Sequence, residues 1–201
     1  SLMRSLIIKG AQNKGPSFLY AFQNGSCGFV GLSPEVLIEI DDKAIRTMAL
    51  AGTSPESNLE NFLLDQKEEI EHQIVVDSLR RRLGKYGKLS ESERKTHNLG
   101  GIVHFLTDIH IKLNQKVSIT EVLKQIHPTP AVGTVPRNSG NFSQLKSFRE
   151  CSSTPEMFAA PFGVKLNQSF FSFIMIRGLF FDNSIISLPT GCGITENSIL
   201  E

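Results

Sequence analysis

The sequence predicts an α+β fold in which a strand-rich, layered core carries helices on its outside. Several short apolar runs, bounded by Gly, Pro, Asn and Asp, are typical of strands, and only three segments have convincing helical periodicity. The chain has 201 residues, of which 40% are hydrophobic, so it can bury one large core or two small ones. It contains no internal repeat and no low-complexity segment.

The first third of the chain carries the clearest strand signals. Apolar runs over 17–22 and 26–30 flank a turn that contains Asn24 and Gly25, which indicates a hairpin. A Ser-Pro dipeptide then interrupts strand pairing, and further strands are predicted over 36–40 and 44–50. The small residues that follow, Gly52 among them, would let a ligand approach the backbone.

Glu35 comes directly after the Ser-Pro dipeptide, between two predicted strands. Two interpretations of this acid are open on the residues alone. It is either a solvated acid at an exposed turn or a catalytic acid held at a strand edge.

One amphipathic helix is predicted over 65–83, and it carries a carboxylate in an unexpected place. Winding the helix at about 100° per residue gives an apolar arc. The arc contains Leu63, Leu64, Ile70, Ile74, Val75 and Leu79. Glu71 falls in the middle of it, where a lone carboxylate is costly to bury. Either Lys67, four residues earlier, neutralises Glu71, or a metal ion or a cationic pocket does so. Glu68 and His72 lie on a flank, where we expect a solvated pair, with metal ligation as the alternative.

The middle of the chain is predicted to be a polar loop, a strand and two short helices. The loop covers 85–98, and the mostly apolar strand over 101–113 carries His104, which is either a satisfied core residue or a catalyst. The helices are predicted over 118–126 and 141–149. A proline-rich turn follows the first of them, and Ala131 begins the small-residue stretch after that turn.

The segment 169–181 is predicted to be one strand buried on both faces, because both of its alternating rows are apolar. Arg177 lies in one of these rows and therefore needs a partner, which is either an internal Asp or Glu or the carboxylate or phosphate of a ligand. A last strand over 184–188 leads into Gly191 and Gly193, whose backbone N–H groups could cradle an anion.

Composition excludes several classes of protein. The net charge of +1 leaves no broad basic field, so neither nucleic-acid binding nor binding at a membrane surface is expected. The apolar run near 170–181 is too short and too interrupted to span a bilayer. Three widely spaced cysteines indicate neither a disulfide framework nor a cysteine-rich zinc site, so a reducing cytoplasm is the expected location. The sequence says nothing about the oligomeric state.

The order of these signals along the chain resembles the chorismate-binding enzyme family, which includes isochorismate, anthranilate, aminodeoxychorismate and salicylate synthases. The matching segments, from about Gly15 onward, are Ser33-Pro34-Glu35, Leu50-Ala51-Gly52-Thr53, the helical stretch from Lys67 to His72, His104-Phe105-Leu106-Thr107, His127-Pro128-Thr129-Pro130-Ala131, Ile176-Arg177 and Gly191-Cys192-Gly193-Ile194. Within the family, the stretch from His127 to Ala131 looks like the isochorismate synthase branch. That branch implies an enzyme that converts chorismate to isochorismate for menaquinone or for a salicylate-type siderophore.

The resemblance implies a role for each unusual residue. Glu35 would be the general acid that protonates the leaving hydroxyl at C4 of chorismate, while water adds at C2. Glu71 would bind Mg²⁺, which holds the ring carboxylate. The remaining positions would bind chorismate: Gly52, His104, Ala131, Arg177, Gly191 and Gly193.

The chain also departs from the family pattern at both ends. In the family, a lysine that activates water lies well before the Ser-Pro-Glu acid, and a final helix after the Gly-x-Gly turn completes the Mg²⁺ site. We therefore expect residues 1–201 to be a partial chorismate-binding domain that is inactive alone. Two alternatives remain: the large subunit of an anthranilate or aminodeoxychorismate synthase, and a non-catalytic remnant that still binds chorismate.

Overall fold

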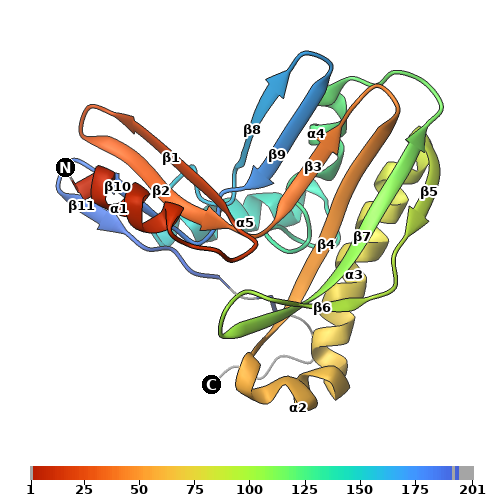
Figure 1. The fold of residues 1–201 in the computed structure, drawn as a ribbon, viewed down its shortest axis with the longest axis horizontal. Helices are drawn as coiled ribbons and strands as arrows, with labels where there is room; N and C mark the ends of the chain where they lie inside the picture. Colours follow the sequence, from red (N-terminus) through yellow and green to blue (C-terminus); the bar gives the residue numbers. More distant parts are fainter. Residues whose placement is uncertain (1, 192, 195–201) are drawn as a thin grey trace.

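The computed structural model describes residues 2–191, 193 and 194 of the chain. It contains two antiparallel sheets, one of four strands and one of seven, with helices against their faces (Figure 1). The predicted α+β class is therefore confirmed. Within the described residues, no helix has the length and apolar character needed to cross a bilayer.

The smaller sheet has the strand order β1-β2-β10-β11, and every neighbouring pair is antiparallel. Its strands are β1 (Phe18–Asn24), β2 (Cys27–Ser33), β10 (Gly178–Asp182) and β11 (Ile185–Ser187). The predicted hairpin is confirmed, since Asn24 pairs with Cys27. Gly25 in its turn has a φ of +59°, a conformation that glycine adopts without strain.

The larger sheet has the order β5-β7-β4-β3-β9-β8, and β6 also pairs with β7. Its strands are β3 (Val36–Ile40), β4 (Ala44–Pro55), β5 (Gly87–Glu91), β6 (Lys95–Asn98), β7 (Ile102–Leu113), β8 (Pro161–Leu166) and β9 (Ser169–Ile174). The long pair β4 and β7 forms its middle, with Ala44 opposite Lys112 at one end and Pro55 opposite Ile102 at the other.

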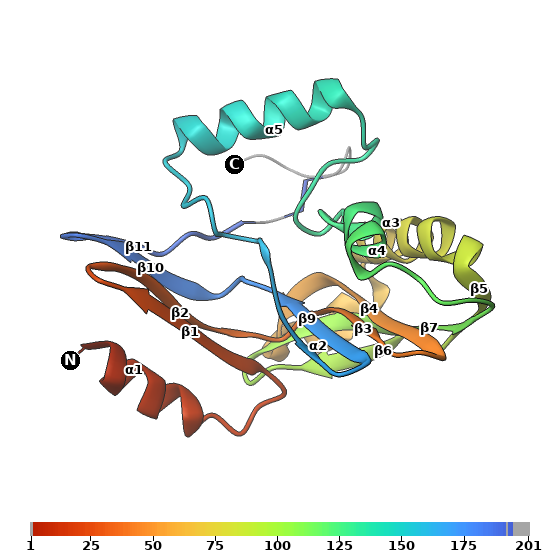
Figure 2. The same cartoon turned by 90° about the horizontal axis from the view of Figure 1, so that it is seen from above.

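The helices are α1 (Leu2–Ala11), α2 (Leu59–Leu64), α3 (Gln66–Leu83), α4 (Ile119–Ile126) and α5 (Ser139–Cys151), with short 3-10 helices at Glu56–Asn58 and Gly84–Tyr86. Figure 2 shows α3 and α4 together against one face of the larger sheet, while α1 lies against the smaller sheet. The predicted central helix is confirmed as α3. It begins after Asp65, whose side chain accepts hydrogen bonds from the N–H groups of Lys67 and Glu68.

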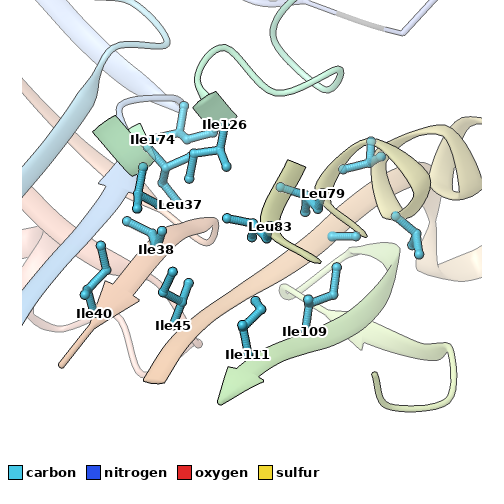
Figure 3. Close-up of a cluster of buried hydrophobic side chains, with 14 of the residues drawn as sticks. Leu37, Ile38, Ile40, Ile45, Leu79, Leu83, Ile109, Ile111, Ile126 and Ile174 are labelled. Atoms are coloured by element: carbon cyan, nitrogen blue, oxygen red, sulfur yellow. The ribbon is translucent and has the colours of Figure 1, made fainter. Parts of the chain in front are cut away.

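Aliphatic side chains from four neighbouring strands, β7, β4, β3 and β9, and from the helices α3 and α4 form the main core (Figure 3). Those labelled in the figure are Leu37, Ile38, Ile40, Ile45, Leu79, Leu83, Ile109, Ile111, Ile126 and Ile174. Full burial of one such side chain stabilises the fold by roughly 1.5–3 kcal/mol. This cluster therefore fixes α3, which carries the acids singled out above, against β4 and β7.

Two segments join the two sheets, and they lie side by side. The chain passes from β2 to β3 through Pro34 and Glu35, and it passes from β9 to β10 through Arg177. Because β2 pairs with β10 and β3 pairs with β9, both joints come together. The Ile174 N–H donates to the Glu35 carbonyl at 3.1 Å, and the Leu32 N–H donates to the Arg177 carbonyl at 3.2 Å.

The predicted single strand over 169–181 is wrong. The chain leaves the larger sheet after Ile174 and enters the smaller one at Gly178, so the segment is two strands. At the break, Arg177 has a φ of +54°, a left-handed conformation that strands do not use. Alternation predicts burial on both faces, but it does not reveal a change of sheet.

The predicted polar loop over 85–98 is also wrong, because this segment forms β5 and β6, which both pair with β7. Their side chains are mostly half-buried or exposed, so the apolar alternation that marks a strand is absent. The helix α1 and the edge strand β8 were not predicted. The strand predicted over 44–50 continues through Gly52 to Pro55.

Candidate active site

Glu35 lies at the joint between the sheets, and it is buried, with 4% of its surface exposed. Its N–H donates to the hydroxyl of Ser33 at 3.3 Å, a local contact that fixes the turn around Pro34. The interpretation of Glu35 as a solvated turn acid is therefore wrong. Burying a carboxyl group costs free energy. Its position in the interior therefore needs an explanation, either a function or local strain.

Burial raises the pKa of Glu35 to about 8, although the positive charge of Arg177 acts in the opposite direction. The carboxyl group is therefore protonated at neutral pH. A protonated carboxylic acid can donate a proton, which is the property required of a general acid.

Arg177 meets His104 rather than an acid. Its Nη2 lies 2.6 Å from Nε2 of His104. The other ring nitrogen, Nδ1, lies 2.9 Å from the carbonyl oxygen of Gly52 and 3.0 Å from the hydroxyl of Thr53. Because a carbonyl only accepts hydrogen bonds, Nδ1 carries the ring proton, and Nε2 accepts from Arg177.

The charge of Arg177 is thus not cancelled by its nearest partner. Burial lowers the pKa of His104 to about 4, so the ring is neutral at physiological pH. Among the described residues, no carboxylate lies within ion-pair distance of Arg177. The described residues therefore do not supply the internal Asp or Glu partner that was one alternative for Arg177. Its guanidinium is able to bind the anionic group of a ligand.

Gly52 forms a bulge in β4 that lies in contact with α3. The register of β4 against β7 shifts between Ala51 and Thr53, and Gly52 has a φ of +76°. A Cβ on Gly52 would lie 2.9 Å from the carbonyl oxygen of Glu68, so only glycine fits against the helix here. The bulge also turns the Thr53 N–H towards the carboxylate of Glu68, which accepts it at 2.6 Å.

Glu71 and Glu68 share one cation, Lys67. The Lys67 ammonium lies 2.6 Å from Oε1 of Glu68 and 3.3 Å from Oε2 of Glu71. Burial lowers the pKa of Lys67, but the hydrogen bonds and charges of the two glutamates outweigh burial, and the net shift is upward. The ion-pair alternative for Glu71 is therefore present in the structure. Glu71 also lies against Gly193, because a Cβ on Gly193 would lie 2.3 Å from its Oε1.

Glu68 and His72 are buried on the inner face of α3, so the prediction of a solvated pair is wrong. His72 Nε2 lies 2.9 Å from the hydroxyl of Thr107 on β7. Burial lowers the pKa of His72 to about 4, and the charge of Arg94 adds to the effect. The inner face of α3 differs from the predicted arc, because Ile70 is exposed and because Leu63 and Leu64, also exposed, belong to the separate helix α2.

The carboxylates of Glu68 and Glu71 are hard oxygen donors of the kind that Mg²⁺ prefers. Mg²⁺ is commonly held by one or two protein carboxylates together with oxygens of the substrate, so these two acids fit the ion in number and chemistry. The described residues contain no group of three or more acidic, histidine or cysteine side chains that could hold a metal alone.

Five of the eight predicted site residues are connected by contacts, whereas Glu35, Ala131 and Gly191 lie outside this network. The network runs from Arg177 through His104, the Gly52 bulge, Glu68 and Lys67 to Glu71 and Gly193. Ala131 packs half-buried against the main core, and Gly191 is exposed with open space around it. Cys192 and residues 195–201 lie outside the described residues.

Sequence reasoning named metal ligation only as the alternative for Glu68, and it did not place Glu68 or Thr53 in this network. The one available signal was the spacing of Glu68 and Glu71, which puts the two carboxylates one turn apart on a helix. Nothing in the local sequence indicates that Thr53 would donate its N–H to Glu68.

A family of sequences described as chorismate binding enzymes matches residues 3–201. The chain belongs to the chorismate-binding enzyme family. The resemblance found in the motifs is confirmed, and it covers nearly the whole chain.

Relatives of the chain include isochorismate synthases and anthranilate synthases. The chain is 29% identical over 196 residues to isochorismate synthase MenF of Bacillus subtilis, covering 90% of this chain and 40% of the relative. It is 30% identical over 192 residues to the salicylate biosynthesis isochorismate synthase of Pseudomonas aeruginosa, with the same coverages of 90% and 40%. It is 25% identical over 213 residues to anthranilate synthase component 1 of Methanothermobacter thermautotrophicus, covering 98% and 45%.

Solved structures of the family share the fold. Isochorismate synthase MenF of Escherichia coli has a TM-score of 0.74 at 24% identity, over 92% of this chain and 45% of that one. DhbC of Bacillus anthracis, which is described as a 2,3-dihydroxybenzoate-specific isochorismate synthase, has a TM-score of 0.78 at 22% identity, over 98% of this chain and 56% of that one. The chain spans about 40% of the length of the first curated relatives that it matches.

Proposed function

We propose that this chain is the part of an isochorismate synthase that supplies the general acid, the groups that bind the enolpyruvyl carboxylate of chorismate, and the Mg²⁺ ligands. The observation that carries the proposal is Glu35, a buried carboxyl group with a pKa of about 8. The alternatives named for the family bind the same substrate but differ in the nucleophile that they add. The two relatives described above with identities of 29% and 30% are isochorismate synthases, which favours water as the nucleophile.

Glu35 would act on the hydroxyl group that leaves from C4 of chorismate. Its proton passes to this hydroxyl oxygen, the C4–O bond breaks, and the group departs as water. A second water molecule adds at C2 and loses its proton to a base, so the atoms balance. The proton must be present on Glu35 at the start of the reaction, which its raised pKa ensures at neutral pH.

Arg177 would hold the enolpyruvyl carboxylate of chorismate, with the backbone of Gly191 and Gly193. Its geometry is set by His104, whose neutral Nε2 accepts one N–H and leaves the guanidinium charge uncancelled. His104 would also lie beside the ring carboxylate, and we place Gly52 and Ala131 near the ring. For Gly52 the support is indirect, since its bulge positions His104 and Glu68 rather than opening space for a ligand.

Mg²⁺ would be held by Glu71, with Glu68 beside it, and would bind and neutralise the ring carboxylate of chorismate. The chain's own contribution is to keep two carboxylates one turn apart and partly buried on α3. Lys67 occupies the space between them with a single positive charge. We propose that this lysine leaves the glutamates when the divalent ion binds. A cytoplasmic location, and a role in menaquinone or siderophore synthesis, complete the proposal.

Replacing Lys67 by methionine should tighten Mg²⁺ binding by about tenfold, because the ion would no longer compete with an ammonium group. The same variant should be less stable than the wild type without Mg²⁺, since Glu68 and Glu71 then repel each other unscreened. Calorimetric titration with MgCl₂ and thermal unfolding measure the two effects. Lys95→Met, which breaks the exposed pair between Lys95 and Asp108, is the matched control and should change neither. Weaker Mg²⁺ binding in Lys67→Met would show that the lysine supports the ion instead of competing with it.

Product analysis tests the function itself. The complete gene product that contains this chain should convert chorismate to isochorismate in the presence of Mg²⁺, with or without ammonium. An aminated product would instead assign it to the anthranilate or aminodeoxychorismate branch. Binding of chorismate without any turnover would leave a non-catalytic remnant and would overturn the proposal.

A further inference from the structure

A second cationic site lies away from the acids of α3, in a hollow of about 480 Å³ where the ends of three helices meet. Arg82 comes from the C-terminal end of α3, Lys124 from the last turn of α4, and Arg137 from the segment before α5. The remaining lining residues are Gln125, Asn138, Ser139 and Phe142. The lining therefore has three positive side chains and no acid.

Both arginines are held in place by neutral carbonyl groups. Arg82 donates to the carbonyl oxygen of Gln125 at 2.8 Å, and Arg137 donates to the same oxygen at 2.6 Å. Arg137 also donates to the carbonyl oxygens of Lys124, at 3.1 Å, and of His127. Its guanidinium carbon lies 5.4 Å from the centre of the Phe142 ring. Two guanidinium groups are thus fixed next to each other without any negative charge between them.

The charge in this hollow is not compensated by the described part of the chain. None of Arg82, Lys124 and Arg137 forms an ion pair with a described acid. Burial lowers the pKa of Arg82, and the charges of Arg137 and Arg81 lower it further, which is the effect of unrelieved repulsion. Glu121, the acid of α4 closest in sequence to Lys124, does not pair with it.

The start of α5 also lines this hollow, through Asn138 and Ser139. Asn138 caps this 13-residue helix, and its side chain accepts from the N–H of Asn141 at 2.9 Å. The preceding N–H groups, of Ser139 and Gly140, belong to the first turn, where the helix itself offers no acceptor. The positive end of the α5 dipole therefore adds to the charge of the three side chains.

We infer that this hollow binds a phosphoryl group, either as the free ion or as a phosphate monoester. A tetrahedral dianion offers at least three acceptor oxygens, which matches donors that arrive from α3, α4 and the start of α5. Arginine side chains and the first turn of a helix are both preferred partners of phosphate. A single carboxylate has only two oxygens, which lie in one plane, so it could not accept hydrogen bonds from α3, α4 and the start of α5 at the same time.

This site is separate from the candidate active site. Arg82 follows Glu71 by 11 residues on α3, which corresponds to roughly 16 Å along a helix that rises 1.5 Å per residue. A phosphorylated ligand bound here would link the ends of three helices. The inference does not depend on the proposed reaction and can fail or succeed independently of it.

Titration of the 201-residue chain with inorganic phosphate, at constant ionic strength, tests the inference. In ¹H–¹⁵N NMR spectra, we expect the amide signals of Ser139 and Gly140 to shift and saturate. Lys124→Gln removes one charge without breaking any hydrogen bond described here, and it should weaken phosphate binding by about tenfold. The control Lys146→Gln removes the same charge from α5 outside the hollow and should leave the affinity unchanged.

Two further ligands define the chemistry. Phenyl phosphate that binds more tightly than inorganic phosphate would identify an ester as the ligand, and equal affinities would identify the free ion. Acetate should cause no saturable shift. The inference is overturned if phosphate causes no saturable shift, if acetate binds as well as phosphate, or if both lysine variants weaken binding equally. In those cases the arginines serve only to hold the end of α4.

Discussion

Between pH 6.5 and 8, the free energy of unfolding of this protein should fall by about 2 kcal/mol, and Glu35→Gln should abolish this fall. Glu35 keeps its proton in the folded state up to a pKa of about 8, whereas in the unfolded chain it loses it near 4.5. The folded state therefore binds more protons than the unfolded state over that range, so stability falls as the pH rises. The slope is close to 1.36 kcal/mol per pH unit at pH 6.5 and falls to half of that at pH 8, so the change over the interval is roughly 1.6 kcal/mol, or about 2.

The lower limit of this window is set by three histidines, of which His72 and His104 are buried and His127 is half-buried. Burial lowers the pKa of His72, His104 and His127 to about 4 from an ordinary value of 6.5. These groups act with the opposite sign, since the stability they contribute is complete above pH 6.5 and is lost as the pH falls through 4. Below pH 6.5 the wild type therefore combines opposing effects, whereas above it Glu35 dominates among the shifted groups.

Chemical denaturation at a series of pH values measures this difference. Subtracting the curve of Glu35→Gln from that of the wild type cancels the histidine contribution, which both proteins share. Glu39→Gln, a half-buried acid on β3, is the matched control and should keep the wild-type fall. Parallel curves for the wild type and Glu35→Gln would show that Glu35 is ionised at neutral pH, and the role of general acid would then fail.

The fold was predictable where local pattern and burial coincide. The hairpin around Gly25 has turn residues, and β7 has a mostly apolar sequence. In both, the tertiary contacts agree with this local pattern. The joint at Arg177 was not predictable in this way, because both β9 and β10 are apolar and the change of sheet occurs within three residues. The edge strands β5 and β6 are set by pairing with β7, which leaves no apolar pattern to detect.

The candidate site was predictable in its residue types but not in its connections. The buried positions of α3 include Glu68, His72, Val75, Val76, Leu79 and Leu83. These positions have regular helical spacing, but the first two are polar. A prediction based on hydrophobic residues alone therefore places the buried face towards Leu63 and Leu64. An acid on the inner face is acceptable because the bulge at Gly52 turns the Thr53 N–H towards Glu68 and because the Lys67 ammonium pairs with the same carboxylate.

The 201-residue chain alone should convert chorismate to isochorismate no faster than the uncatalysed background. In the family that it resembles, a lysine upstream of the Ser-Pro-Glu acid removes the proton from the attacking water, and a positioned base of this kind contributes typically 10²- to 10⁴-fold. Lys67 cannot replace that base. It is held by Glu68 and Glu71, and its raised pKa keeps it protonated, whereas a base must start the reaction without its proton.

The measurement is formation of isochorismate by the chain in saturating Mg²⁺, compared with the Glu35→Gln variant. Calorimetric titration with chorismate must accompany it, because a chain that binds the substrate and loses that binding in Arg177→Gln is folded and only lacks catalytic groups. In the wild-type chain and in Glu35→Gln, Arg177 and the other binding groups would hold chorismate, but no base removes the proton from the attacking water. Neither protein should therefore form product. Turnover by the wild-type chain that disappears in Glu35→Gln would mean that these 201 residues contain a base, and Lys67 would be the first residue to test for that role.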